Sequence, residues 1–192
     1  MITPSRVVTV LALSFLIIAK NAAADTWAYP PVKKDRVESF GHSRIVLTAD
    51  ARKNRQYPDF ILSIYFKNDL RAKYRGLGFD KLFSSPDNSY FLGLSNSGIP
   101  GTAVILFDRH GKLMLEVKHG FASFDYCDSS VTLKREWFDE KNPEVTFIMD
   151  EKYGGFKSIT LRDCKGNKVD LFHIVLQAYN NSFQRSAASG VR

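Results

Sequence analysis

The chain holds two cysteines and four histidines, the residue types best suited to nucleophilic or metal chemistry. Cys127 follows His119 and Asp125 closely, and a thiolate nucleophile needs a base and a group that orients the base. This spacing gives one hypothesis, a Cys/His-dependent hydrolase. The competing hypothesis pairs Cys127 with Cys164, and a third leaves both as buried thiols. We expect the disulfide, which in the chain-entropy model adds roughly 4 kcal/mol of stability for a loop of this length.

The other chemical motifs are missing from the sequence. There is no G-x-S-x-G, H-E-x-x-H, P-loop or C-x-x-C pattern. The histidines, at positions 42, 110, 119 and 173, are dispersed, and the aspartates fall at turns, where aspartate is ordinary turn chemistry. We therefore expect no catalytic set, no metal site and no cofactor.

The N-terminus predicts export. Arg6 precedes an apolar run of 13 residues, Val7–Ala19, and an A-x-A pattern ends at Ala24. A run of that length is shorter than the roughly 20 residues that span a bilayer, so a cleaved signal peptide over residues 1–24 is favoured over an uncleaved anchor. The expected location is periplasmic or secreted, with no membrane span after cleavage. That compartment also permits disulfides.

Composition limits the class of partner. Loss of Arg6 and Lys20 with the signal peptide takes the net charge from +7 to +5. Basic residues cluster at 33–36, 52–55 and 71–75. An exported basic protein seldom meets nucleic acid, so anionic lipid headgroups, cell-wall polymers or an acidic protein are the expected attractors. The clusters also fit solvated turns and strand faces, and the oligomeric state is left open.

The remaining sequence predicts an all-β domain of antiparallel meanders and hairpins, either propeller-blade-like or a β-sandwich. We expect an extended lead-in over residues 25–41, a single β domain over 42–179 and a polar tail over 180–192. Residues 70–83 are ambiguous, and residues 169–179 fit a last strand or a short helix. Strands are expected at residues 44–48, 60–66, 90–94, 102–107, 113–117, 130–138, 144–149 and 158–162.

Two segments of the chain share one pattern at an offset of 55 positions. Placing Asp108 over Asp163 also places Gly111 over Gly166, which predicts two meander repeats at about 79–118 and 130–170. The Ser85-Pro86-Asp87 turn, the apolar strands after it and the Asp108–Lys112 hairpin resemble the blade repeat of TolB-like β-propellers. The resemblance implies propeller-like meanders packed on each other, and implies no activity.

These observations favour an exported, non-enzymatic protein-binding module, an inhibitor or immunity-type protein that neutralises an enzyme or toxin in the cell envelope. Polar glycine loops on rigid strands suit insertion into a partner's cleft. The partner-binding residues expected on that hypothesis are Ser95, Asn96 and Ser97, with Arg109 and His110 on the neighbouring hairpin. The alternative is an envelope binder of anionic polymer or lipid that uses the clusters at 52–55 and 71–75.

Overall fold

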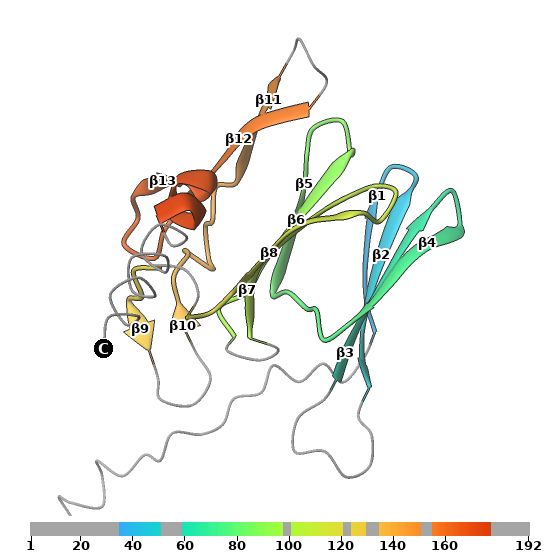
Figure 1. The fold of residues 1–192 in the computed structure, drawn as a ribbon, viewed down its shortest axis with the longest axis horizontal. Helices are drawn as coiled ribbons and strands as arrows, with labels where there is room; N and C mark the ends of the chain where they lie inside the picture. Colours follow the sequence, from blue (N-terminus) through green and yellow to red (C-terminus); the bar gives the residue numbers. More distant parts are fainter. Residues whose placement is uncertain are drawn as a thin grey trace, which may run out of the picture.

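The computed structural model describes residues 35–50, 59–97, 101–120, 124–129, 135–150 and 155–177. They form antiparallel sheets stacked in sequence order (Figure 1). This confirms the all-β class. Among the described residues, no helix is long and apolar enough to cross a bilayer.

The first sheet is a four-stranded meander with one face on the core. Its strands are β1 (Arg36–Phe40), β2 (Ser43–Asp50), β3 (Asp59–Phe66) and β4 (Asp69–Arg75). Along β3 the buried residues Phe60, Leu62 and Ile64 alternate with partly exposed ones, as a half-buried strand requires. The sheet therefore has an inner and an outer face.

The second sheet is buried on both faces of its central strands. It consists of β5 (Lys81–Ser84), β6 (Tyr90–Leu94), β7 (Thr102–Asp108) and β8 (Leu113–Lys118). All residues of β7 except Asp108 are buried. A nearly all-apolar strand is stable only where both of its faces are covered, so this sheet forms the middle layer.

The third layer is built from shorter strands. It comprises β9 (Asp128–Ser129) with β10 (Arg135–Glu136), then β11 (Thr146–Asp150), β12 (Gly155–Arg162) and β13 (Lys168–Asp170). A short helix over residues 171–177 follows β13 directly. Asp170 begins this helix by accepting hydrogen bonds from the backbone N–H groups of Phe172 and His173 at 2.8 and 3.2 Å.

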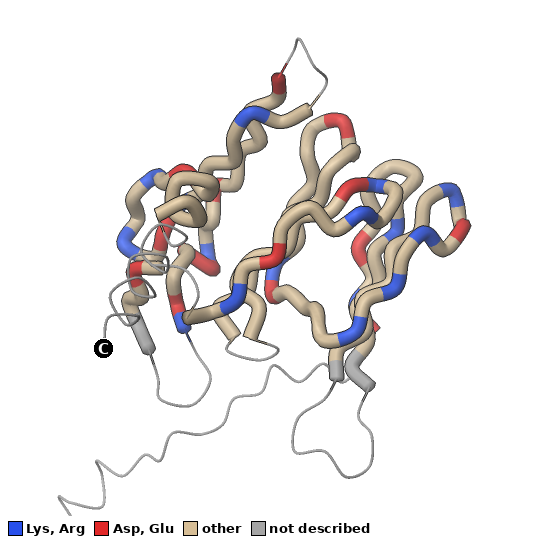
Figure 2. Tube along the Cα trace, viewed as in Figure 1, with Lys and Arg blue, Asp and Glu red and all other residues tan. Residues whose placement is uncertain are grey.

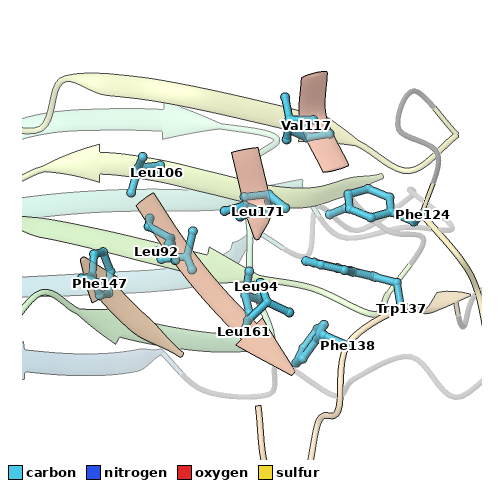
Figure 3. Close-up of a cluster of buried hydrophobic side chains, with 14 residues drawn as sticks. Leu92, Leu94, Leu106, Val117, Phe124, Trp137, Phe138, Phe147, Leu161 and Leu171 are labelled. Atoms are coloured by element: carbon cyan, nitrogen blue, oxygen red, sulfur yellow. The ribbon is translucent and has the colours of Figure 1, made fainter. Parts of the chain in front are cut away.

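Two hydrophobic clusters hold the layers together. One lies between the first and second sheets and includes Phe60, Phe91 and Phe107. The other lies between the second sheet and the third layer and includes Leu94, Leu161 and the fully buried Phe138 (Figure 3). The middle sheet contributes to both clusters because alternate residues of its strands point to opposite faces.

Most expected strands are present, with corrections at the ambiguous segments. Residues 70–83 contain parts of β4 and β5, and the expected lead-in at 25–41 contains β1. The end of the β domain is a strand followed by a helix, so both readings of residues 169–179 hold in part. Of the strand expected over 130–138, the structure describes residues 135–138 and assigns only Arg135–Glu136 to a strand. The signal peptide and the tail over 180–192 lie outside the described residues.

The two D-x-x-G hairpins have the same turn geometry. In each, the aspartate carbonyl accepts a hydrogen bond from the glycine N–H, at 2.9 Å for Asp108–Gly111 and 3.0 Å for Asp163–Gly166. The two glycines have φ of +85° and +87°, which side-chain-bearing residues rarely adopt. The stacked antiparallel hairpins are compatible with a blade-like fold.

Candidate functional site: a cationic tip around Phe66

Three turns from two sheets meet at one end of the molecule (Figure 1). They are the β1–β2 turn at Gly41–His42, the β3–β4 turn at Lys67–Asn68 and the β7–β8 turn at Arg109–His110. The N–H of Lys67 donates to the carbonyl of His42 at 2.9 Å, and this bond joins the first two turns. We call this region, with Phe66 at its centre, the Phe66 tip.

Cationic side chains surround the ring of Phe66. The charged groups of Lys67, Arg109 and Arg71 lie 5.7, 5.7 and 5.9 Å from its centroid. These distances are within the range of cation–π attraction. Two described carboxylates lie at these turns: Asp69 pairs with Arg71 at 3.2 Å, and Asp108 accepts backbone amides of its own turn. The three cations outnumber them, so the tip carries an excess of positive charge.

Two histidines also contact the ring of Phe66. The His110 imidazole meets Phe66 edge-on with centroids 5.6 Å apart, and His42 does so at 6.4 Å. Both histidines are exposed, whereas Phe66 is half-buried. The tip therefore exposes hydrogen-bond donors and positive charge to solvent, and the half-buried ring of Phe66 lies beneath them.

The β7–β8 turn is fixed against the first sheet. The Tyr74 hydroxyl donates to the carbonyl of Gly111 at 2.6 Å. A Cβ on Gly111 would lie 2.5 Å from the Cβ of Ala72, so only glycine permits this close approach. The carboxylate of Asp108 accepts the N–H groups of His110 and Lys112, each at 2.9 Å. Such a turn has little conformational freedom left to lose on binding.

The structure brings together only part of the predicted partner-binding set. Arg109 and His110 belong to the Phe66 tip, but Ser95 and Asn96 are buried, with 2% and 3% of their surface exposed. Ser97 is half-buried. The side chains of Ser95 and Asn96 make hydrogen bonds within the protein, so their position does not support the predicted role.

Ser95, Asn96 and Ser97 follow strand β6 and are held by Asp80. The Asp80 carboxylate accepts hydrogen bonds from the Ser95 hydroxyl and the Asn96 N–H, both at 2.8 Å, and from the Ser97 N–H at 3.1 Å. The Asn96 side chain then crosses to the third layer. Its Oδ1 accepts the Trp137 N–H at 3.1 Å, and its Nδ2 donates to the Phe138 carbonyl at 3.3 Å. We call these contacts the Asn96 network.

His119 lies near the same network, in a setting that disfavours its charge. Burial and, to a smaller extent, the neighbouring positive charge of Arg135 together lower the pKa of His119 to about 4, against opposing effects of the Ser95 and Ser97 carbonyls and of Asp80. Its Nδ1 lies 3.3 Å from the Tyr126 hydroxyl, while its buried Nε2 has no hydrogen-bond partner. The neutral imidazole is therefore the form that stabilises the fold.

This environment predicts a loss of stability in acid. Because the folded pKa of about 4 lies below the usual value of 6.5, the stabilisation is complete above pH 6.5 and is lost as the pH falls toward 4. Partial exposure limits the loss to about 1–2 kcal/mol. Urea unfolding of His119→Gln should show a shallower loss of stability over this range than the wild type. His173→Gln, in the exposed part of the helix, is the control and should retain the wild-type slope.

Cys127 has no free thiol in this structure. Its sulfur lies 2.04 Å from that of Cys164, at bonding distance, and the two Cα atoms are 6.0 Å apart. The expected pairing is therefore present. The Cys127–His119–Asp125 nucleophile arrangement lacks its nucleophile, since a thiol bonded to a second sulfur cannot form a thiolate.

A hollow of about 400 Å³ lies beside this disulfide, between residues 124–125 and the helix at 171–177. Its carboxylates already have partners: Asp125 pairs with Lys165, Asp163 accepts turn amides, and Asp170 caps the helix. The hydrogen bond to Asp125 raises the pKa of Lys165. Because these polar groups stabilise the local turns and the helix start, the Phe66 tip is the better candidate site.

The sequence indicated Arg109, His110 and Arg71 but gave no reason to group them with Phe66, Lys67 and His42. A polar turn after an apolar strand was visible at residues 67–69. The proximity of this turn to Arg109 depends on how the two sheets stack. Comparison with protein-family models, with curated proteins and with solved structures found no match for this chain.

Proposed function

We propose that this chain is an exported, non-enzymatic binding module that docks the Phe66 tip into an acidic cleft of a protein partner. On this proposal it acts as an inhibitor or immunity-type protein against an enzyme or toxin in the cell envelope. The observation that carries the proposal is the convergence of three turns and three cations on Phe66. The scaffold behind the tip would be a set of TolB-like blades.

The geometry suits insertion of the tip into a partner. Hairpin turns project from the ends of sheets, and these turns are braced by the Lys67–His42 and Tyr74–Gly111 hydrogen bonds. Arginine is enriched among the residues that dominate binding energy, because its planar guanidinium donates several hydrogen bonds to carboxylates. Arg109, half-buried against Phe66, is therefore the residue expected to contribute most.

Charge reversal at the tip tests the proposal. Partner proteins are captured from the native envelope with the wild-type protein, and their affinity for purified variants is then measured by titration. Arg109→Glu should weaken binding at least about 30-fold, the equivalent of a 2 kcal/mol hot spot. Lys157→Glu, an exposed cation of β12 in the third layer, is the matched control and should bind as the wild type does.

Two results would contradict this assignment. Wild-type affinity in both the Arg109→Glu and the Lys157→Glu protein would show that the tip is not the contact surface. Equal weakening by both would show a response to net charge alone, as expected for a polyanion that attracts the whole basic protein.

A further inference from the structure

The outer face of the first sheet is left uncovered by every described element. The inner side chains of β2 and β3 pack in the cluster against the second sheet, whereas the alternate residues are half-buried or exposed. The strand registers arrange the outer residues in three cross-strand rows: Val37–Val46–Ser63–Lys73, Ser39–Arg44–Tyr65 and Thr48–Ile61–Arg75. We call these ten residues the outer face.

The ten residues of the outer face carry charge of one sign. Arg44, Lys73 and Arg75 are exposed and none of the ten is acidic, whereas the next row along β2 and β3 pairs Asp50 with Asp59 at the end of the sheet. Blue segments lie along β4 in Figure 2, the strand that carries Lys73 and Arg75. Arg44 lies over the Tyr65 ring at 4.4 Å, so cation and aromatic ring form one contact surface. An anionic partner is the complement of such a surface.

The face also carries apolar area between its cations. Val37 is 53% exposed and lies beside the half-buried Val46, while Ile61 is half-buried in the next row. A soluble polyanion would use the positive charges and leave these aliphatic groups in water. A lipid surface would contact both the cations and the aliphatic groups. Arginine and lysine reach the phosphates, while tyrosine and aliphatic groups lie at the headgroup level.

We propose that the outer face docks this protein onto an anionic phospholipid surface. A second copy of the chain is a poor occupant, because a two-fold contact through this face would bring like charges together. The docking is independent of the Phe66 tip. The two surfaces would allow the protein to stay at an envelope membrane and bind a partner at the same time.

Vesicle binding tests the proposal with protein purified after export, so that processing is complete. The probes are vesicles of phosphatidylglycerol and phosphatidylcholine in equal parts, and vesicles of phosphatidylcholine alone. The wild type should bind only the anionic vesicles, less strongly as salt rises. The triple variant Arg44→Gln, Lys73→Gln, Arg75→Gln should bind on the order of a hundredfold less, about fivefold for each cation.

Matched variants separate the outer face from net charge. The control triple Lys118→Gln, Lys157→Gln, Lys168→Gln removes the same charge from exposed sites elsewhere and should retain most of the binding. Val37→Asp keeps every cation but places a carboxylate in the apolar part, and should also weaken vesicle binding. Arg109→Glu should bind vesicles nearly as the wild type does, which separates this test from that of the proposed function.

Three outcomes would overturn the proposal. The first is absence of wild-type binding to anionic vesicles. The second is an equal loss in the two triple variants, which would indicate attraction by net charge alone. The third is binding to polyglutamate that depends on Arg44, Lys73 and Arg75 while vesicle binding does not, which would assign the face to an acidic protein.

Discussion

Replacement of Asn96 by alanine should lower the free energy of unfolding by about 2–4 kcal/mol. The Asn96 amide is 3% exposed and hydrogen-bonds both the N–H of Trp137 and the carbonyl of Phe138. Alanine has neither the Oδ1 acceptor nor the Nδ2 donor of asparagine, so the two buried backbone groups lose these hydrogen bonds. Each such group costs about 1–3 kcal/mol. Urea unfolding followed by tryptophan fluorescence measures the loss.

Asn142→Ala is the matched control for this prediction. Asn142 is exposed and bonds the Glu144 carboxylate at 3.1 Å, so its loss should change stability by less than about 0.5 kcal/mol. The pair also decides between the two roles considered for Asn96. A stable Asn96→Ala protein that has lost affinity for its partner would show that the residue contacts the partner and that the network is dispensable.

Removal of the disulfide should also lower the free energy of unfolding by about 2–4 kcal/mol. Cys127 belongs to the segment before β9, and Cys164 lies in the β12–β13 turn. Each cysteine N–H also donates to a backbone carbonyl: that of Cys127 to Glu136 in β10 at 2.9 Å, and that of Cys164 to Trp137, the next residue, at 3.1 Å. The bond therefore links two short segments of the third layer that lie 37 positions apart in the sequence. The double variant Cys127→Ser, Cys164→Ser should unfold at lower urea concentration than the wild type.

Reduction of the wild type provides the control for the disulfide. A thiol reductant should shift the wild-type unfolding midpoint to that of the double variant and leave the variant's own midpoint unchanged. Identical midpoints for oxidised wild type and double variant would mean that the third layer does not depend on the bond.

The strands were the most predictable part of the protein. In β3 the buried Phe60, Leu62 and Ile64 alternate with less buried residues, and β7 is buried and apolar from Ala103 to Phe107. Both patterns arise from local geometry, because side chains of a strand alternate between two faces. The D-x-x-G turns were predictable for the same reason, since glycine permits the positive φ that the turn requires.

The roles of the polar residues were less predictable. Ser95 and Asn96 follow a strand and begin a glycine-containing stretch, which is typical of an exposed loop. In the structure the third layer packs over them, so their hydrogen bonds join layers. A polar side chain at a strand end can face water or cross to another element, and the local sequence is the same in both cases.

The sequence alone thus predicted the all-β class, the main hairpins and, among open alternatives, the pairing of its only two cysteines. Only the tertiary structure decided that Phe66 gathers Lys67, Arg71 and Arg109, and that none of the described elements covers the outer face of the first sheet. The physical reason is that strand periodicity is set by neighbours along the chain. Which layer covers which face is set by contacts between residues tens of positions apart.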